Sequence, residues 1–129
     1  MSNIVETLHL DETKLGKGIE FVGLITKNGR LVAPKEKNGL EISKDRREMF
    51  FMGLSLQQRM NSEYDDDLGQ VEYSMTEREN QIIITIPQAH DTLIFVMDKS
   101  GNFASRLKNL LDAVRQGKNL AHSKNSMAV

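Results

Sequence analysis

The stretch that decides the fold is Val22-Gly-Leu-Ile-Thr-Lys-Asn-Gly-Arg-Leu-Val32. Two runs of apolar and β-branched residues flank Asn28-Gly29, a dipeptide that readily adopts the two positive φ angles of a type I′ turn. The stretch therefore predicts a β-hairpin whose first strand covers 19–26. Pro34 has no backbone N–H to donate to a neighbouring strand, so we expect the second strand to end there.

The next predicted element is a long helix, with Ser43 as its N-cap and an end near Asn61 or Tyr64. Apolar residues at helical spacing form a main stripe, others widen it sideways, and two more point elsewhere on the cylinder. One core does not require so much apolar surface on one helix. These three groups are Met49, Gly53, Leu56 and Met60; Phe50, Leu54 and Gln57; and Phe51 and Met52.

Three strands are predicted after this helix. In the segment 70–77, Val71, Tyr73 and Met75 alternate with polar residues, which is typical of a strand with one buried face. A turn leads to a strand over 81–86, and Pro87 opens the next turn. The strand over 92–97 is apolar on both faces and is therefore expected at the centre of the sheet.

Helices are predicted at both ends of the chain. The segment 3–15 spaces its apolar residues as a short amphipathic helix. The last helix carries one apolar stripe and is expected to end at Gly117, which leaves 118–129 as a loose polar tail. The two apolar sets are Ile4, Val5, Leu8 and Leu15, and Phe103, Leu107, Leu110, Leu111 and Val114.

The predicted order is α-β-β-α-β-β-β-α in one domain over residues 1–117. We expect an α+β fold with a five-stranded antiparallel sheet, the middle helix on one face and the terminal helices on the other.

Composition sets limits on function. The chain has 129 residues, 39% hydrophobic and 27% charged, with 17 basic and 18 acidic residues, so no net field favours nucleic acid. It has no cysteine, which excludes disulfides and thiolate chemistry. No basic and apolar leader precedes the first segment, and no apolar run approaches the roughly 20 residues that span a bilayer. These features predict a cytoplasmic protein without membrane insertion.

The residues that could carry chemistry form no recognised motif. His9, His90 and His122 lack metal-ligand spacing, and the acidic segment 63–67 lacks the alternating pattern of a calcium loop. Acidic neighbours interleave with the basic residues of the segment 44–48, which favours a solvated helix face over a phosphate site. The chain also lacks a nucleophile elbow and a phosphate-binding glycine loop. We therefore expect no enzyme activity, no metal and no cofactor.

The element order resembles the roadblock (dynein light-chain) family, related to the profilin and longin folds, from about Ile4 to Val114. The resemblance rests on the hairpin over 22–32, the long helix, Leu68-Gly-Gln-Val-Glu-Tyr73 and the elements after it. More narrowly, Phe21-Val-Gly-Leu-Ile, Gly29-Arg-Leu-Val and Tyr64-Asp-Asp-Asp-Leu-Gly-Gln-Val-Glu-Tyr-Ser resemble a group of small archaeal proteins of ammonia-oxidising lineages.

The resemblance implies a non-catalytic module that dimerises through its long helix and third strand, here 48–60 and 70–77. It also implies a partner protein, which for this family includes small Ras-like GTPases. We expect Phe50→Asp or Phe51→Asp to give a soluble monomer. The expected dimer interface comprises Met49, Phe50, Phe51, Met52, Leu56, Met60, Val71, Tyr73 and Met75.

An alternative stays open from the residues alone. Small-molecule sensor domains of the PAS or GAF kind also combine a five-stranded sheet with flanking helices. In that case a ligand would lie between sheet and helix, lined by Met49, Phe50 and Tyr73.

Overall fold

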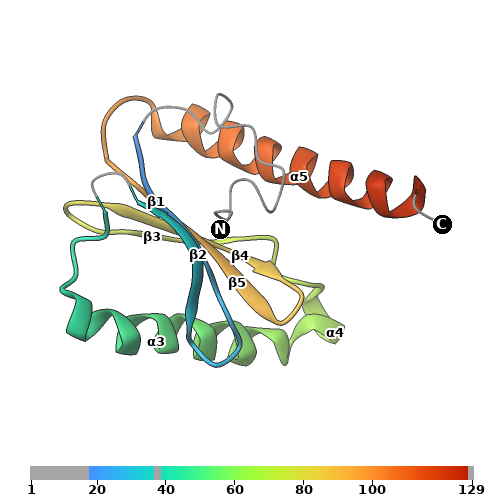
Figure 1. The fold of residues 1–129 in the computed structure, drawn as a ribbon, viewed down its shortest axis with the longest axis horizontal. Helices are drawn as coiled ribbons and strands as arrows, with labels where there is room; N and C mark the ends of the chain where they lie inside the picture. The colour runs from blue at the N-terminus through green and yellow to red at the C-terminus, as the bar shows by residue number, and fades with distance from the viewer. Residues whose placement is uncertain (1–17, 37–38, 128–129) are drawn as a thin grey trace.

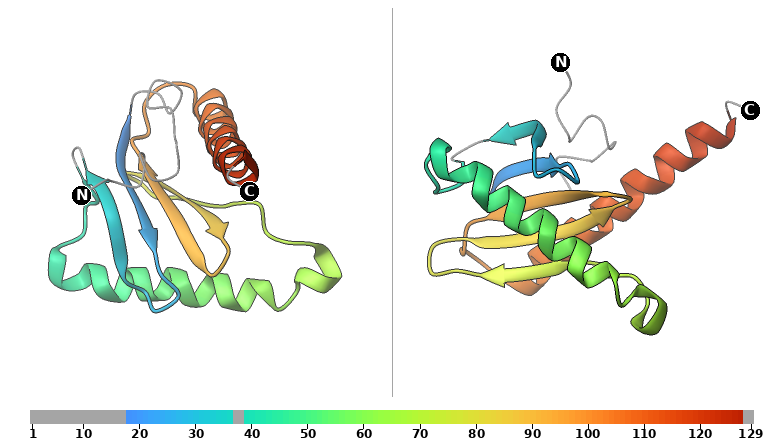
Figure 2. Two further views of the ribbon diagram at one scale, coloured as in Figure 1. Left: turned by 45° about the vertical axis from the view of Figure 1, so that its right-hand side comes forward. Right: turned by 90° about the horizontal axis from the view of Figure 1, so that it is seen from below.

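A computed structural model describes residues 18–36 and 39–127. It contains a five-stranded antiparallel sheet in the order β2-β1-β5-β4-β3. Helix α3 crosses one face diagonally and α5 covers the other (Figures 1 and 2), which confirms the predicted α+β class. The helix predicted over 3–15 lies outside the described residues. The elements are β1 (Ile19–Ile25), β2 (Leu31–Glu36), α3 (Lys44–Ser62), α4 (Asp65–Leu68), β3 (Ser74–Glu77), β4 (Ile82–Gln88), β5 (Asp91–Met97) and α5 (Phe103–Met127).

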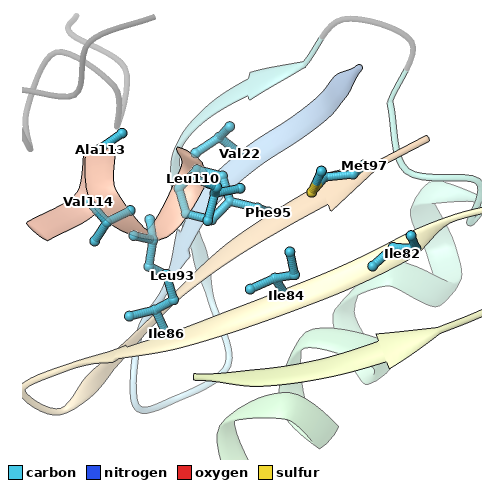
Figure 3. Close-up of a cluster of buried hydrophobic side chains, with 10 residues drawn as sticks. All are labelled: Val22, Ile82, Ile84, Ile86, Leu93, Phe95, Met97, Leu110, Ala113 and Val114. Atoms are coloured by element: carbon cyan, nitrogen blue, oxygen red, sulfur yellow. The ribbon is translucent and has the colours of Figure 1, made fainter. Parts of the chain in front are cut away.

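The central strand β5 supplies both halves of the core, as its two apolar faces predict. Leu93, Phe95 and Met97 point toward α5 and pack with Leu110 and other α5 residues (Figure 3). The residues between them point toward α3, because successive side chains of a strand alternate between its faces. That second cluster consists of Phe21, Ile25, Leu40, Phe51, Ile83, Ile94 and Val96.

The first hairpin is present, but its turn differs from the predicted type I′. Gly29 has a φ of +81°, whereas Asn28 does not have a positive φ. The Gly29 N–H donates to the Thr26 carbonyl at 2.8 Å, and the Thr26 N–H donates to the Arg30 carbonyl at 2.8 Å. This is a three-residue loop in which only the last residue has a positive φ, so a single glycine, Gly29, is sufficient for the turn.

Both prolines lie inside strands, so the predicted strand ends at Pro34 and before Pro87 are wrong. Between the pairs Val22–Lys35 and Leu24–Val32 the register of β1 and β2 shifts, and Pro34 falls in this irregularity. Since β2 is an edge strand and the register is interrupted, a residue without an N–H is tolerated there. Pro87 pairs with Thr92 beyond the end of β3, where β4 has no second neighbour.

Two other elements differ in length from the prediction. Strand β3 begins at Ser74 and not at residue 70 as predicted. The residues before Ser74 do not pair with β4, and among them the Glu72 carboxylate forms an ion pair with the Arg115 guanidinium of α5 at 3.5 Å. Helix α5 continues through Gly117 to Met127, so the predicted end at this glycine is wrong. A glycine costs a helix about 1 kcal/mol but removes no hydrogen bond, and no proline follows it. The division into a domain and a polar tail stays a prediction.

Candidate interaction surface

Helix α3 has two different apolar faces, and the one against the sheet is anchored by Phe51. This side chain is 3% exposed and its ring stacks on Phe21 with centroids 6.2 Å apart. Phe50 and Leu54 are half-buried beside it. The residues that close the core are therefore different from the stripe of Met49, Leu56 and Met60 that dominates the sequence pattern.

Polar side chains fix the rotation of α3 about its own axis. The Ser55 hydroxyl donates to the Lys27 carbonyl at 2.9 Å, which ties the helix to the first hairpin. The Gln58 amide donates to the Asp91 carbonyl at 3.0 Å, and the buried Thr92 hydroxyl donates to the Gln58 amide oxygen. Because these bonds hold both hairpin ends against one side of α3, the opposite side stays turned outward.

Arg47 fixes the position of α3 at the first turn of the helix. Its guanidinium donates to the Glu36 carboxylate at 2.7 Å and to the Leu40 carbonyl at 2.9 Å, and it lies over the Phe21 ring. The hydrogen bond from Arg47 lowers the pKa of the Glu36 carboxyl below its usual value. The sequence predicted a solvated face for this basic segment, but Arg47 instead holds the loop before α3 in place.

The outward face of α3 is an exposed apolar stripe. Met49 is 81% exposed and Met60 is 67% exposed, and Leu56 and Met52 lie between them with smaller exposed fractions. Leu68 of α4 is 84% exposed beyond the end of the helix. Exposed apolar residues that gather along one element mark interaction sites more often than scattered ones do. We call Met49, Met52, Leu56 and Met60 the outer stripe.

The edge strand β3 provides a second surface. Its outer side has no neighbouring strand among the described residues, so its backbone is available for pairing with another chain. Tyr73 and Met75 are partly exposed and Val71 is half-buried. Met75 pairs with Ile84, which faces α5, so Met75 lies on the opposite face of the sheet from α3.

The nine residues expected at a dimer interface thus fall into three groups. Phe51 belongs to the core of this chain, so the expectation that Phe51→Asp gives a soluble monomer conflicts with its burial. Phe50 packs partly against the same core. The other seven lie on the outer stripe, on β3 or in the segment just before β3, and an interface that joins them must wrap around that edge: Met49, Met52, Leu56, Met60, Val71, Tyr73 and Met75.

A groove of about 720 Å³ lies where β3 stops short of the end of β4. Leu54 and Gln58 of α3, Val71, and Leu111 and Arg115 of α5 are among the residues that line it. The ligand site expected between sheet and helix from Met49, Phe50 and Tyr73 is not assembled, because Met49 points outward and none of the three lines this groove.

The structure does not bring the other candidate residues together into a metal or catalytic site within the described residues. Within residues 18–36 and 39–127, no group of three or more acidic, histidine or cysteine side chains is placed to hold a metal ion. His90 is exposed in the turn between β4 and β5. His9 lies outside the described residues. In the same described part, no helix is both long and apolar enough to cross a membrane.

Sequence reasoning missed the residues that orient α3. Arg47 and Gln58 resemble ordinary polar helix residues, and their partners are backbone carbonyls distant in the sequence. One signal was present for Phe51 and Ser55: they are four residues apart and therefore share a helix face. Because Ser55 is polar, the pattern of apolar residues did not show that this face of α3 lies against the sheet.

Comparison with known proteins gives the class of fold. No protein-family model and no curated protein matches the chain. Solved structures do: a structure described as MglB with tetrameric arrangement has a TM-score of 0.65 and 14% identity, and covers 92% of this chain and 88% of its own. The gliding protein MglB from Thermus thermophilus has a TM-score of 0.65 and 15% identity, with the same coverage.

A roadblock/LC7 domain from Streptomyces avermitilis matches with a TM-score of 0.61 and 9% identity, covering 94% of this chain and 99% of that one. The chain therefore has the roadblock/LC7 fold, as the sequence resemblance implied. The narrower resemblance to archaeal proteins finds no support in these comparisons.

Proposed function

We propose that this protein is a non-catalytic, cytoplasmic interaction module of roadblock type that forms a homodimer through the outer stripe and the β3 edge. The observation that carries the proposal is the outer stripe itself, because α3 already has a complete inner face. Burying two such surfaces against each other removes exposed apolar area from water, which favours association. A standard interface buries about 1,600 Å² in total.

The fold supports oligomerisation in general, since one structure of similar fold is described as a tetrameric arrangement. A small Ras-like GTPase as a further partner rests on the family resemblance. Purified Ras-like GTPases loaded with GDP or with a non-hydrolysable GTP analogue test that part. Binding of either form supports it, and a lack of binding restricts the proposal to the homodimer.

The dimer is tested by light scattering over a hundredfold range of protein concentration. We expect a mass near twice 14.6 kDa for the wild-type protein and a folded monomer for Leu56→Asp. Val32→Asp is the matched control, because Val32 is a comparably exposed apolar residue on the opposite edge strand. A wild-type monomer, or a Leu56→Asp variant that stays dimeric, contradicts the proposal.

The groove beside β4 favours a second candidate function, the binding of a small polar molecule. Amide and hydroxyl side chains line it together with apolar ones, among them Gln57, Asn61, Thr85 and Ile86. A ligand present at 100 times its dissociation constant stabilises the folded state by about 2.7 kcal/mol. Thermal shifts with a panel of nucleotides and metabolites test this, and no shift with any of them speaks against it.

A further inference from the structure

The methionines of this chain lie mostly at its surface, although methionine is ordinarily among the buried residue types. The sequence has seven methionines and no cysteine. Among the described side chains Met97 is fully buried, and the others lie exposed on the outer stripe or on β3: Met49, Met52, Met60 and Met75. In a chain without thiols, the thioether of methionine is the group that peroxides oxidise most readily.

Met49 and Met60 are the most accessible of these side chains. They are 81% and 67% exposed, whereas no other described methionine exceeds 42%. They are eleven residues apart, which is about three helical turns and 16.5 Å, so both lie along one line of α3. Met52 is less exposed because its sulfur lies against Gly29 of the first hairpin. A reagent from solvent therefore meets Met49 and Met60 first.

We infer that Met49 and Met60 are sites of reversible oxidation by peroxides, and that their oxidation separates the two copies of the protein. The choice of sites stands on exposure within one chain, whereas the effect on assembly rests on the proposed homodimer. The thioether sulfur attacks one oxygen of hydrogen peroxide, and the O–O bond breaks as the S–O bond forms. Sulfur gives up two electrons, and the departing hydroxide takes the remaining proton and leaves as water. The product is methionine sulfoxide, which reductases convert back to methionine.

Oxidation changes the outer stripe from apolar to polar and leaves the inner face of α3 intact. The sulfoxide oxygen accepts hydrogen bonds from water and loses them when it is buried without a donor. Leu56, between the two sites on the stripe, offers no such donor, and Phe51 on the inner face has no sulfur to oxidise. We expect oxidation at both positions to raise the dissociation constant of the dimer by at least about a hundredfold.

Association and oxidation oppose each other. The proposed dimer covers the sulfurs of the outer stripe, so peroxide reaches them in the free chain. The rate of oxidation at Met49 and Met60 should therefore fall as the protein concentration rises. Met97 is the internal reference, because it is 0% exposed in the core of the sheet and should react only after the protein unfolds.

Mass spectrometry of peptides measures oxidation at each methionine, since one added oxygen increases the mass by about 16 Da. The protein is treated with hydrogen peroxide over a hundredfold range of concentration, and light scattering gives its mass before and after treatment. We expect Met49 and Met60 to react first, and the treated dimer to become a monomer whose circular dichroism is that of the folded protein. Methionine sulfoxide reductases should then restore the dimer.

Two double variants separate the sulfur chemistry from the shape of the side chain. Met49→Leu with Met60→Leu removes both sulfurs and keeps a similar apolar volume, so this variant should remain dimeric in peroxide. Met49→Gln with Met60→Gln supplies polar, uncharged side chains of similar length, so this variant should be a folded monomer without any oxidant.

The outcomes distinguish the inference from the proposed function. An untreated wild-type monomer overturns the homodimer and with it the control of assembly. An untreated dimer that stays dimeric with both methionines oxidised overturns the inference alone, and so does a leucine variant that dissociates in peroxide. Oxidation of Met97 as fast as that of Met49, or no oxidation of Met49 and Met60 in the most dilute sample, overturns the choice of sites.

Discussion

Replacing Phe51 by alanine should cost much more stability than replacing any residue of the outer stripe. Phe51 is 3% exposed, stacks on Phe21 and contacts the core of the α3 side, which leaves a cavity after truncation. Such Phe→Ala changes cost about 3–5 kcal/mol. With a slope of about 1.5 kcal/mol per molar urea, a loss of about 4 kcal/mol lowers the unfolding midpoint by about 2.7 M.

Urea unfolding followed by far-ultraviolet circular dichroism measures this, because the chain has no tryptophan. Met49→Ala is the control: its side chain is 81% exposed, so its effect should be small in dilute protein and should grow with protein concentration if the proposed dimer forms. The loss for Phe51→Ala should persist in the most dilute samples. Equal losses for both variants, or a loss below about 1 kcal/mol for Phe51→Ala, would refute the assignment of the inner face.

Three further predictions follow from the same geometry. The bond from Arg47 lowers the pKa of Glu36, so the ionised carboxylate stabilises the folded state above the unfolded pKa of about 4.5. This stabilisation is lost as the pH falls through the lowered pKa of the folded state. Urea midpoints should therefore decrease at acid pH, and Glu36→Gln should reduce that decrease. Gln58→Ala leaves the buried Thr92 hydroxyl without its acceptor and should cost about 1–3 kcal/mol by urea titration. Gly53→Ala should raise the melting temperature, because alanine favours the helix by about 1 kcal/mol and a Cβ at this position meets no atom within 4 Å; thermal unfolding followed by circular dichroism measures this.

The order of the sheet and helices was predictable because it depends on local signals. The hairpin at Asn28-Gly29, the apolar strand β5 and the stripe of Leu110 and Val114 each occupy their expected place. Errors occurred where a single residue type was taken as a terminator. Pro34 does not end its strand, because an edge strand tolerates a residue without an N–H that a central strand does not. Gly117 does not end its helix, because a long helix tolerates the cost of one glycine.

The orientation of α3 was not predictable from periodicity. The sequence pattern alone does not distinguish a stripe that faces a sheet from one that faces solvent, because both are apolar at the same spacing. The choice is made by Ser55, Gln58 and Arg47, which bond to carbonyls in other elements. Those bonds have no signature in a single sequence, so Phe51 was expected at the same interface as Met49 and Met60, although it faces the sheet.

The outer stripe is better explained by a protein partner than by the fold of a single chain. Methionines exposed to water gain no burial energy, so the stripe does not stabilise an isolated chain. The inner face of α3 shows that the same helix is otherwise fully satisfied, with a buried ring and bonded polar groups. In the homodimer that we propose, contact with a second copy would bury these methionines, so the stripe would then stabilise the assembly.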